Sequence, residues 1–172
     1  MTSIESTRLL LRDYRDDLSE LESILKFVSD PEVARHSSWG PLSRAEALAF
    51  LKEVVSAVHA QPRMNYSLAL LIRSTDELIG NMSLNIRNLK HREAELGYTV
   101  AMAHWNKGYA SEAARALIAF GFKQLGLHRI IATTSPGNIA SQKVLERIGF
   151  TREGYLKQNV LQRGSWRDSL LY

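Results

Sequence analysis

The alternation of hydrophobic and polar positions changes its period near the middle of the chain. Between Ala94 and Val100 apolar and polar residues alternate, which predicts a strand with one apolar face. Beyond Ser111 small and apolar residues recur at every third or fourth position, which predicts an amphipathic helix. Gly126 is expected to end that helix as its C-cap. A strand that leads through a short polar turn into a helix is therefore expected here.

The N-terminal third predicts one strand followed by helices. In order, these elements are a strand at 7–12, a helix capped by Asp16 or Asp17, a short helical segment at 33–36 and a helix from Ser43. Pro31 separates the first helix from the short segment, because its ring cannot continue a helix. Ser43 and Glu46 have the spacing of a capping box, which satisfies two free backbone N–H groups.

The rest of the chain predicts strands on both sides of two helices. An antiparallel meander is expected from strands at 66–72, 78–86 and from Glu93 onward. Further elements are a strand at 129–135, a helix at 138–148 with Gly149 as C-cap, and strands at 150–161 and 165–172. The second helix is expected to turn Ala140, Val144, Leu145 and Ile148 inward. This order predicts an α+β fold with a mixed sheet, in a single domain spanning 1–172.

Composition narrows the class of protein. A chain of 172 residues with 45% hydrophobic and 23% charged residues is typical of one soluble globular domain. The net charge of +4 suits an anionic ligand, and no basic stripe with interleaved aromatic residues indicates nucleic acid. There is no cysteine, which excludes disulfides and thiolate chemistry, and the five histidines lack the spacing of metal ligands.

Targeting and membrane signals are not expected. The N-terminus has neither the basic nor the apolar segment of a signal peptide, and no apolar run is long enough to span a bilayer. We therefore expect a cytoplasmic protein without a membrane or nucleic-acid partner.

The polar turn at 106–111 carries the first candidate chemistry. A helix that begins there directs free backbone N–H groups and the positive end of its dipole outward. Gly108 allows the backbone to approach a bulky anion, and Lys107 adds a full positive charge. Phosphate or pyrophosphate is the expected ligand. Considered alone, the turn is equally consistent with an ordinary helix start.

The residues around this turn resemble a known cofactor motif. Trp-Asn-Lys-Gly-Tyr-Ala at 105–110 follows Glu-Leu-Gly-Tyr at 95–98 and precedes Ser-Glu-Ala. The combination resembles the acetyl-coenzyme A motif of the GNAT superfamily of N-acetyltransferases, most closely the branch of the ribosomal-protein N-terminal acetyltransferases. Gly108 and Ala110 match the superfamily pattern Gln/Arg-x-x-Gly-x-Gly/Ala. Trp105 stands at the Gln/Arg position, as is usual in this branch.

The resemblance implies a fold and a set of cofactor contacts. The fold is a mixed, mostly antiparallel sheet of six to seven strands, flanked by about four helices, with a splayed strand pair at the acetyl-CoA site. The backbone that holds the pantetheine arm is that of Tyr98, Thr99, Val100, Ala101 and Met102. The diphosphate turn consists of Asn106, Lys107, Gly108, Tyr109, Ala110 and Ser111. Asn138 is implied to contact the pantetheine, and Lys143 to reach the phosphates.

Glu95 is the candidate general base, acting directly or through water. It shares a strand face with Gly97, whose small size leaves room for a ligand. The alternative is an exposed strand glutamate paired with Arg92 or Lys90. An α-amino group has a pKa of about 8 and is partly neutral at pH 7, whereas a lysine amine at about 10.4 is almost wholly charged and needs a stronger base. One modest carboxylate therefore suits a protein N-terminus better than a lysine.

Ser141 is the candidate group beside the leaving thiolate. Many GNAT enzymes use a tyrosine seven residues after the asparagine, where this chain has Leu145. The alternative is purely structural, with Asn138 as N-cap and Ser141 in the first helical turn. Lys143 and Arg147 are expected on the exposed side of the same helix, where charged residues are more often simply solvated.

The expected function is acetyl transfer from acetyl-CoA to a primary amine, most simply a protein N-terminal amine. A small-molecule acceptor such as a polyamine, an amino acid or an aminoglycoside stays open. A non-catalytic acyl-CoA binding module and a nucleotide-binding protein also stay open as functions. A homodimer stays open as the oligomeric state. The expected acceptor loops, Ser37–Ser43 and Lys90–Arg92, contain no recognisable specificity motif.

Overall fold

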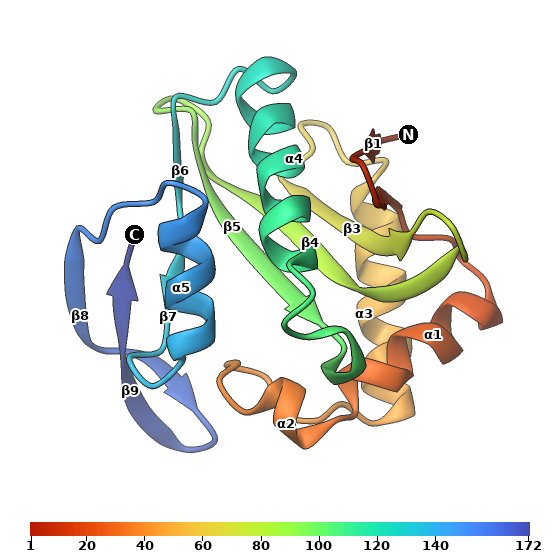
Figure 1. The fold of residues 1–172 in the computed structure, drawn as a ribbon, viewed down its shortest axis with the longest axis horizontal. Coiled ribbons are helices and arrows are strands. Elements are labelled where there is room, and N and C mark those ends of the chain that lie inside the picture. The colour runs from red at the N-terminus through yellow and green to blue at the C-terminus, as the bar shows by residue number, and fades with distance from the viewer.

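The computed structural model describes residues 1–172 and is centred on a six-stranded sheet with the order β1-β2-β3-β4-β5-β6 (Figure 1). The strands are β1 Ser3–Glu5, β2 Leu9–Asp13, β3 Asn65–Ile72, β4 Glu77–Asn88, β5 Glu93–Val100 and β6 Arg129–Ile131. All neighbours are antiparallel except β5 and β6, which are parallel. The predicted meander is therefore confirmed as β3, β4 and β5, while β1 was not predicted.

A second sheet of three strands lies beside the first. Its order is β7-β9-β8, with β7 Thr133–Thr134, β8 Gly154–Gln162 and β9 Ser165–Leu171. The prediction of a single strand at 129–135 was wrong, because β6 and β7 belong to different sheets. Between them, the N–H and carbonyl of Ala132 pair with the carbonyl and N–H of Tyr172, both at 2.9 Å, which draws the chain away from β5.

Five helices surround the sheets, against about four expected. They are α1 Leu18–Val28, α2 Pro31–Ala34, α3 Arg44–Ala57, α4 Tyr109–Lys123 and α5 Ile139–Arg147, and a 3-10 turn covers Met102–His104. Asp17 caps α1 and Ser43 forms the predicted capping box with Glu46. No helix has the length and apolar character needed to cross a membrane.

The helices form a layer on each face of the large sheet. Figure 1 shows α4 and α5 in front of the strands and α3 behind them. The alternation of β3 reflects this arrangement, since Leu68 and Leu70 belong to the core under α4, whereas Ala69 and Leu71 belong to the core under α1 and α3. Burial on both faces explains why β3 reads as a nearly continuous apolar run.

Two predicted helix ends differ in detail. Helix α4 ends at Lys123 with Gln124 as its C-cap, two residues before the predicted C-cap, although Gly126 does adopt a left-handed φ of 64°. In α5 the cap position is Ile148, and Gly149 follows with φ 96°. Ala140 was predicted to face inward, but it is exposed. Leu145 is the one buried residue of α5, so the helix presents a narrower face to the core than the pattern predicted.

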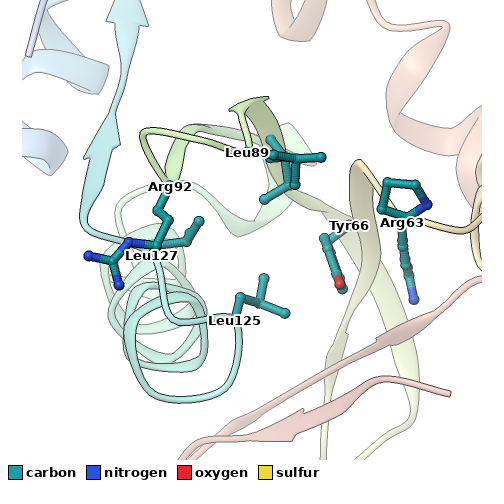
Figure 2. Close-up of a pocket in the computed structure, with 8 residues that line it drawn as sticks. Arg63, Tyr66, Leu89, Arg92, Leu125 and Leu127 are labelled. Atoms are coloured by element: carbon teal, nitrogen blue, oxygen red, sulfur yellow. The ribbon is translucent and has the colours of Figure 1, made fainter.

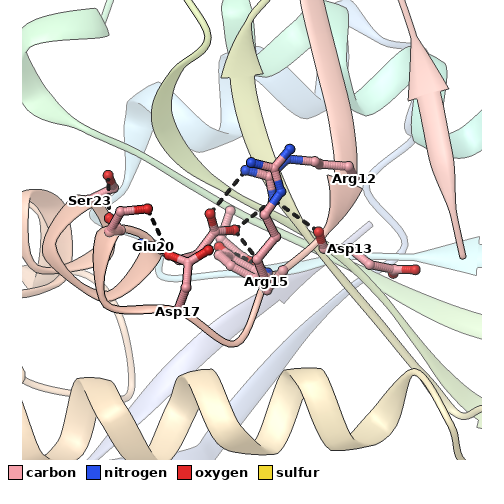
Figure 3. A network of polar contacts seen from close by, with 9 residues as sticks. Arg12, Asp13, Arg15, Asp17, Glu20 and Ser23 are labelled. Atoms are coloured by element: carbon pink, nitrogen blue, oxygen red, sulfur yellow. Dashed lines mark hydrogen bonds and ion pairs between the residues drawn. The ribbon is translucent and has the colours of Figure 1, made fainter.

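A buried ion pair joins the end of β2 to α1. The Glu20 carboxylate accepts hydrogen bonds from both terminal nitrogens of Arg12, at 2.7 and 3.0 Å, and from the Arg15 N–H at 3.2 Å (Figure 3). Glu20 is only 4% exposed. Burial opposes the charge on Arg12, but the hydrogen bond and the attraction to Glu20 prevail and raise the pKa of Arg12.

Replacing Glu20 with Gln is expected to lower the free energy of unfolding by about 3 kcal/mol, because it leaves the Arg12 charge without its partner. Urea denaturation of the purified protein measures the difference. The matched control is Glu22→Gln, whose ion pair with Arg44 is more than half exposed on both sides, so its cost is expected to stay below about 1 kcal/mol. Equal losses in the two variants would contradict the expectation.

Candidate active site

The large sheet opens along one edge of β5. Strands β5 and β6 pair only where Glu93–Glu95 faces Arg129–Ile131. On that edge β5 then continues unpaired to Val100, while its other edge stays paired with β4. Beyond Ile131 the chain enters the second sheet as β7, so the two ribbons diverge (Figure 1). This is the expected splayed pair. The free edge of β5 leaves backbone donors and acceptors that an extended ligand can use.

The turn after β5 ends at a helix start with unoccupied N–H groups. Gly108 is the N-cap of α4, with a left-handed φ of 78° and no side-chain hydrogen bond at the cap. Because L side chains rarely adopt this φ, glycine suits the position. The N–H groups of Tyr109, Ala110 and Ser111 have no backbone partner. Together with the helix dipole they fit a diphosphate.

Two side chains outside the predicted set of contact residues hold this turn in place. The Trp105 indole N–H donates to the Val100 carbonyl at 2.7 Å, which ties the turn to the end of β5. Arg8 donates to the Lys107 carbonyl at 3.1 Å and lies 4.6 Å from the centre of the Tyr109 ring. Trp105 therefore has a structural reason to occupy the Gln/Arg position of the motif.

Arg8 also connects the first turn of α4 to the N-terminus. Its Nε forms an ion pair with Glu112 at 2.7 Å, and the hydroxyl of Ser6 donates to the same carboxylate at 2.8 Å. Partial burial opposes the charge on Glu112, but the hydrogen bonds from Arg8 and Ser6 lower its pKa. A charged Glu112 in the first turn is also favoured by the helix dipole.

A cleft of about 560 Å³ lies beside the turn and is rich in arginine. Gly108 and Ser111 form one wall, and Arg115 and Arg147 lie further along. Arg115 donates to the Arg147 carbonyl at 2.8 Å and neither guanidinium has an acidic partner. Lys143, the residue expected to reach phosphate, is exposed on α5 and does not line this cleft. The cleft suits a further anionic group.

Glu95 lies at the start of the opening, where the pairing of β5 with β6 ends. Its carboxylate accepts from the Thr133 hydroxyl at 2.7 Å and from Arg87 at 2.7 Å, and its side chain is 20% exposed. Neither Arg92 nor Lys90 pairs with it. Gly97 lies close to Ser83, since a Cβ at Gly97 would meet the Ser83 hydroxyl at 2.7 Å. Room for a ligand beside Gly97 stays a prediction.

Ser141 is linked to β5 from the opposite face of the sheet. Its hydroxyl lies 2.9 Å from the Tyr98 hydroxyl, and its N–H donates to the Asn138 side chain at 3.1 Å. Asn138 is thus the N-cap of α5. Burial raises the pKa of Tyr98 to about 12, which keeps the phenol protonated at neutral pH. A group in the opening can be approached from Glu95 on one side and from Ser141 on the other.

One expected acceptor loop lies at the start of β5, three residues before Glu95. Lys90–Arg92 connects β4 to β5 at the end remote from the turn, next to a hollow of about 240 Å³ (Figure 2). That hollow is lined mainly by apolar side chains such as Leu89, Leu125 and Leu127. Of the two tryptophans outside the motif, Trp39 packs on the core of α1 and α3, while Trp166 is 61% exposed.

No group of three or more His, Cys, Asp or Glu side chains is placed to hold a metal ion. The polar chemistry described so far is that of hydroxyls, two carboxylates, guanidinium groups and backbone N–H groups.

Comparison with known proteins finds similarity along most of the chain, beyond the turn at 106–111. Residues 8–151 match the family described as acetyltransferase (GNAT) domain. The protein called uncharacterized N-acetyltransferase YoaA, of Bacillus subtilis (strain 168), is 33% identical over 169 residues, which cover 98% of this chain and 94% of that protein. The crystal structure of a GNAT-family acetyltransferase from Bacillus anthracis superimposes with a TM-score of 0.86 and 30% identity, covering 99% of this chain and 96% of that one.

A partial likeness concerns an enzyme with a named substrate. The ribosomal protein uS5-alanine N-acetyltransferase of Escherichia coli (strain K12) is 38% identical over 97 residues, which are 55% of this chain and 50% of that protein. The family match and the Bacillus relatives, in contrast, run along most or nearly all of the chain. The chain therefore belongs to the GNAT family and is an acetyl-CoA-dependent N-acetyltransferase.

Proposed function

We propose that this enzyme acetylates the α-amine at the N-terminus of a protein, by direct attack of that amine on the thioester of acetyl-CoA. Glu95 accepts the proton of the amine, directly or through water, and Ser141 lies beside the leaving thiolate. The partial likeness to the uS5-alanine enzyme supports a protein acceptor. The chemistry of Glu95 supports an α-amine.

The hydrogen-bonding of Glu95 carries this proposal. One carboxylate oxygen already accepts from the Arg87 guanidinium and the other from Thr133. These two contacts hold the partly exposed carboxylate at the start of the opening, where it can take a proton from an attacking amine. An α-amine, with a pKa of about 8, needs little help to become neutral at pH 7, whereas a lysine or polyamine amine at about 10.4 needs much more.

The remaining groups supply the other needs of the reaction. The amine nitrogen bonds to the carbonyl carbon, the carbon–sulfur bond breaks, and the amine proton passes towards Glu95. Backbone N–H groups on the free edge of β5 suit the developing oxyanion. A thiol has a pKa of about 8.5, so its thiolate leaves with no more than a hydrogen bond from Ser141.

For the coenzyme we propose the contacts that the motif implies. The backbone of residues 98–102 holds the pantetheine arm, with Asn138 nearby, and the turn at 106–111 holds the diphosphate. Lys143 reaches out from α5, and Arg115 and Arg147 offer a cationic cleft to a further phosphate. We also propose that residues 1–172 act as one domain. A cytoplasmic location, a homodimer and the absence of a metal stay predictions.

Replacing Gly108 with Ala is expected to weaken coenzyme A binding about tenfold, because the left-handed backbone is strained and a methyl group enters the turn. Isothermal titration measures the dissociation constant. The control is Gly126→Ala at the other end of α4, which has a similar φ of 64° and open space around it. It is expected to lose stability but to bind coenzyme A as before. Equal binding by both variants would rule out a diphosphate at this turn.

The acceptor class is tested by thiol release from acetyl-CoA with a panel of N-terminal peptides, polyamines and aminoglycosides. The proposal expects turnover with peptides that carry a free α-amine. Faster turnover with polyamines would favour a small-molecule enzyme. Tight coenzyme binding with no turnover on any acceptor would favour a binding module.

A further inference from the structure

Arg167 on β9 is a half-buried cation without an acidic partner. Its Nε and Nη1 atoms are inaccessible to solvent and make no hydrogen bond, and the guanidinium takes part in no ion pair. Burial lowers the pKa of Arg167, and no carboxylate counteracts this. Buried charges in proteins are normally paired, since an unpaired one costs several kcal/mol. Arg167 therefore has the environment of a residue that awaits an anion.

The strand register places Arg167 on the same face of the small sheet as Thr133, the residue that donates a hydrogen bond to Glu95. Thr133, which holds Glu95, lies opposite Leu171 in the antiparallel pair of β7 and β9. Opposite residues share a face and alternate residues of one strand do too. Leu171, Ser169 and Arg167 therefore follow one another along the face that Thr133 occupies. Leu170, on the other face, packs in the core with Leu145 of α5.

A second unsatisfied group accompanies Arg167. The hydroxyl of Ser169, two residues along the same face, is buried without a partner in a residue that is 1% exposed. Unpaired buried polar side chains are uncommon in native structures, and each calls for an explanation such as an absent ligand. Two of them side by side on one strand indicate a polar ligand site rather than an isolated packing defect.

The opposite wall comes from the end of α2. Gln162 at the tip of the β8–β9 hairpin donates to the Ser37 carbonyl, and Arg163 donates to the Ala34 carbonyl at 3.3 Å. His36 follows α2, and a Cβ at Gly137 would lie 3.7 Å from its ring. Burial, then the charges of Arg35 and Arg167, lower the pKa of His36, so it is neutral at pH 7. The one nearby carboxylate, Glu32, pairs with Arg35 at 3.5 Å.

We propose that Arg167 and Ser169 bind a carboxylate carried by the amine acceptor, so that this enzyme selects acidic acceptors. The inference rests on the proposed function and names its substrate class. Arg167 lies one strand spacing across from β7 and four residues along β9 from Leu171, which is roughly 14 Å from Thr133. About two to four residues of an extended peptide, together with the long arginine side chain, span that distance. A guanidinium fork binds a carboxylate through two parallel hydrogen bonds. The same charge repels the polycationic polyamines.

The test uses matched peptides in the thiol-release assay with the full chain. Ala-Asp-Ala amide is expected to show a kcat/KM at least about tenfold above Ala-Asn-Ala amide. In Arg167→Gln this ratio is expected to fall to about one, with the neutral peptide little changed. Comparison of free alanine with alaninamide shows whether an α-carboxylate serves instead of a side chain. Arg152→Gln, an exposed arginine elsewhere, is the control and is expected to keep the wild-type ratio.

Two further measurements separate this inference from the proposed function. Calorimetric titration of Ala-Asp-Ala amide in the presence of coenzyme A follows binding without turnover, and Arg167→Gln is expected to abolish the preference for the acidic peptide. Arg167→Met is expected to raise the melting temperature by about 2–4 °C, because a half-buried charge without an acidic partner is removed. A binding preference that survives Arg167→Gln, or a lower melting temperature for Arg167→Met, would overturn the inference. Failure of every acceptor to turn over would count against the proposed function alone.

Discussion

Glu95→Gln is expected to lower kcat by about 100-fold or more while coenzyme A binding is unchanged. The substitution keeps the size of the side chain and its contact with Thr133 but removes the ability to accept a proton. General base catalysis commonly contributes a factor of about 10²–10⁴. The measurement is steady-state thiol release with a peptide acceptor, combined with calorimetric titration of coenzyme A.

The control for Glu95 is Arg87→Gln, which removes the ion pair and keeps the carboxylate. Its kcat is expected to change by less than about tenfold, because the pair is half exposed and worth little. If Glu95→Gln retained kcat within about threefold, Glu95 would be a structural residue that links β4, β5 and β7, and the base would lie elsewhere.

Gly80→Ala is expected to reduce the free energy of unfolding by about 3 kcal/mol or more. A Cβ at this position in β4 would lie 2.1 Å from the Thr99 carbonyl oxygen and 3.1 Å from the Val100 Cα. These atoms are backbone, so β5 itself must shift, and overpacking of this kind is among the costly mechanisms. The displaced segment is the one proposed to hold the pantetheine arm, so coenzyme binding is expected to weaken as well.

Urea denaturation compares this variant with Gly121→Ala. Gly121 is also buried, but a Cβ there meets only the ends of the Leu84, Leu127 and Ile130 side chains, at 3.0 to 3.2 Å. These side chains can adjust, and alanine gains about 1 kcal/mol of helix propensity in α4. The expected change for Gly121→Ala is therefore within about 1 kcal/mol of zero. Similar losses at both positions would contradict the close approach of β4 to β5.

Most of the fold was predictable because its signals are local. The capping box at Ser43 and the alternation along β3, β4 and β5 depend on residues close together in the chain. The break between β6 and β7 was not predictable in this way. The residues of 129–135 have a continuous strand pattern, and pairing of Ala132 with Tyr172 decides where the strand divides.

The candidate site was predictable in part for the same reason. The turn and Gly108 were identified from the motif, and the structure places them at an open helix start beside a splayed strand. Arg8 and Arg167 were missed, and Trp105 was identified as part of the motif but not as a contact. Arg8 reaches a partner 104 residues away, and an arginine in a strand carries no sign of whether an acid will face it.

By itself, the sequence determined the order of strands and helices, the helix caps, the glycine turn that suits a diphosphate and the family to which the chain belongs. Each of these depends on side-chain periodicity or backbone hydrogen bonding within a few residues. The tertiary structure alone decided that Thr133 and Arg87 hold Glu95, that Tyr98 meets Ser141 across the opening, and that two guanidinium nitrogens of Arg167 are buried without a partner. Such contacts join separate elements, so their geometry exists only when the whole sheet and its helices have packed together.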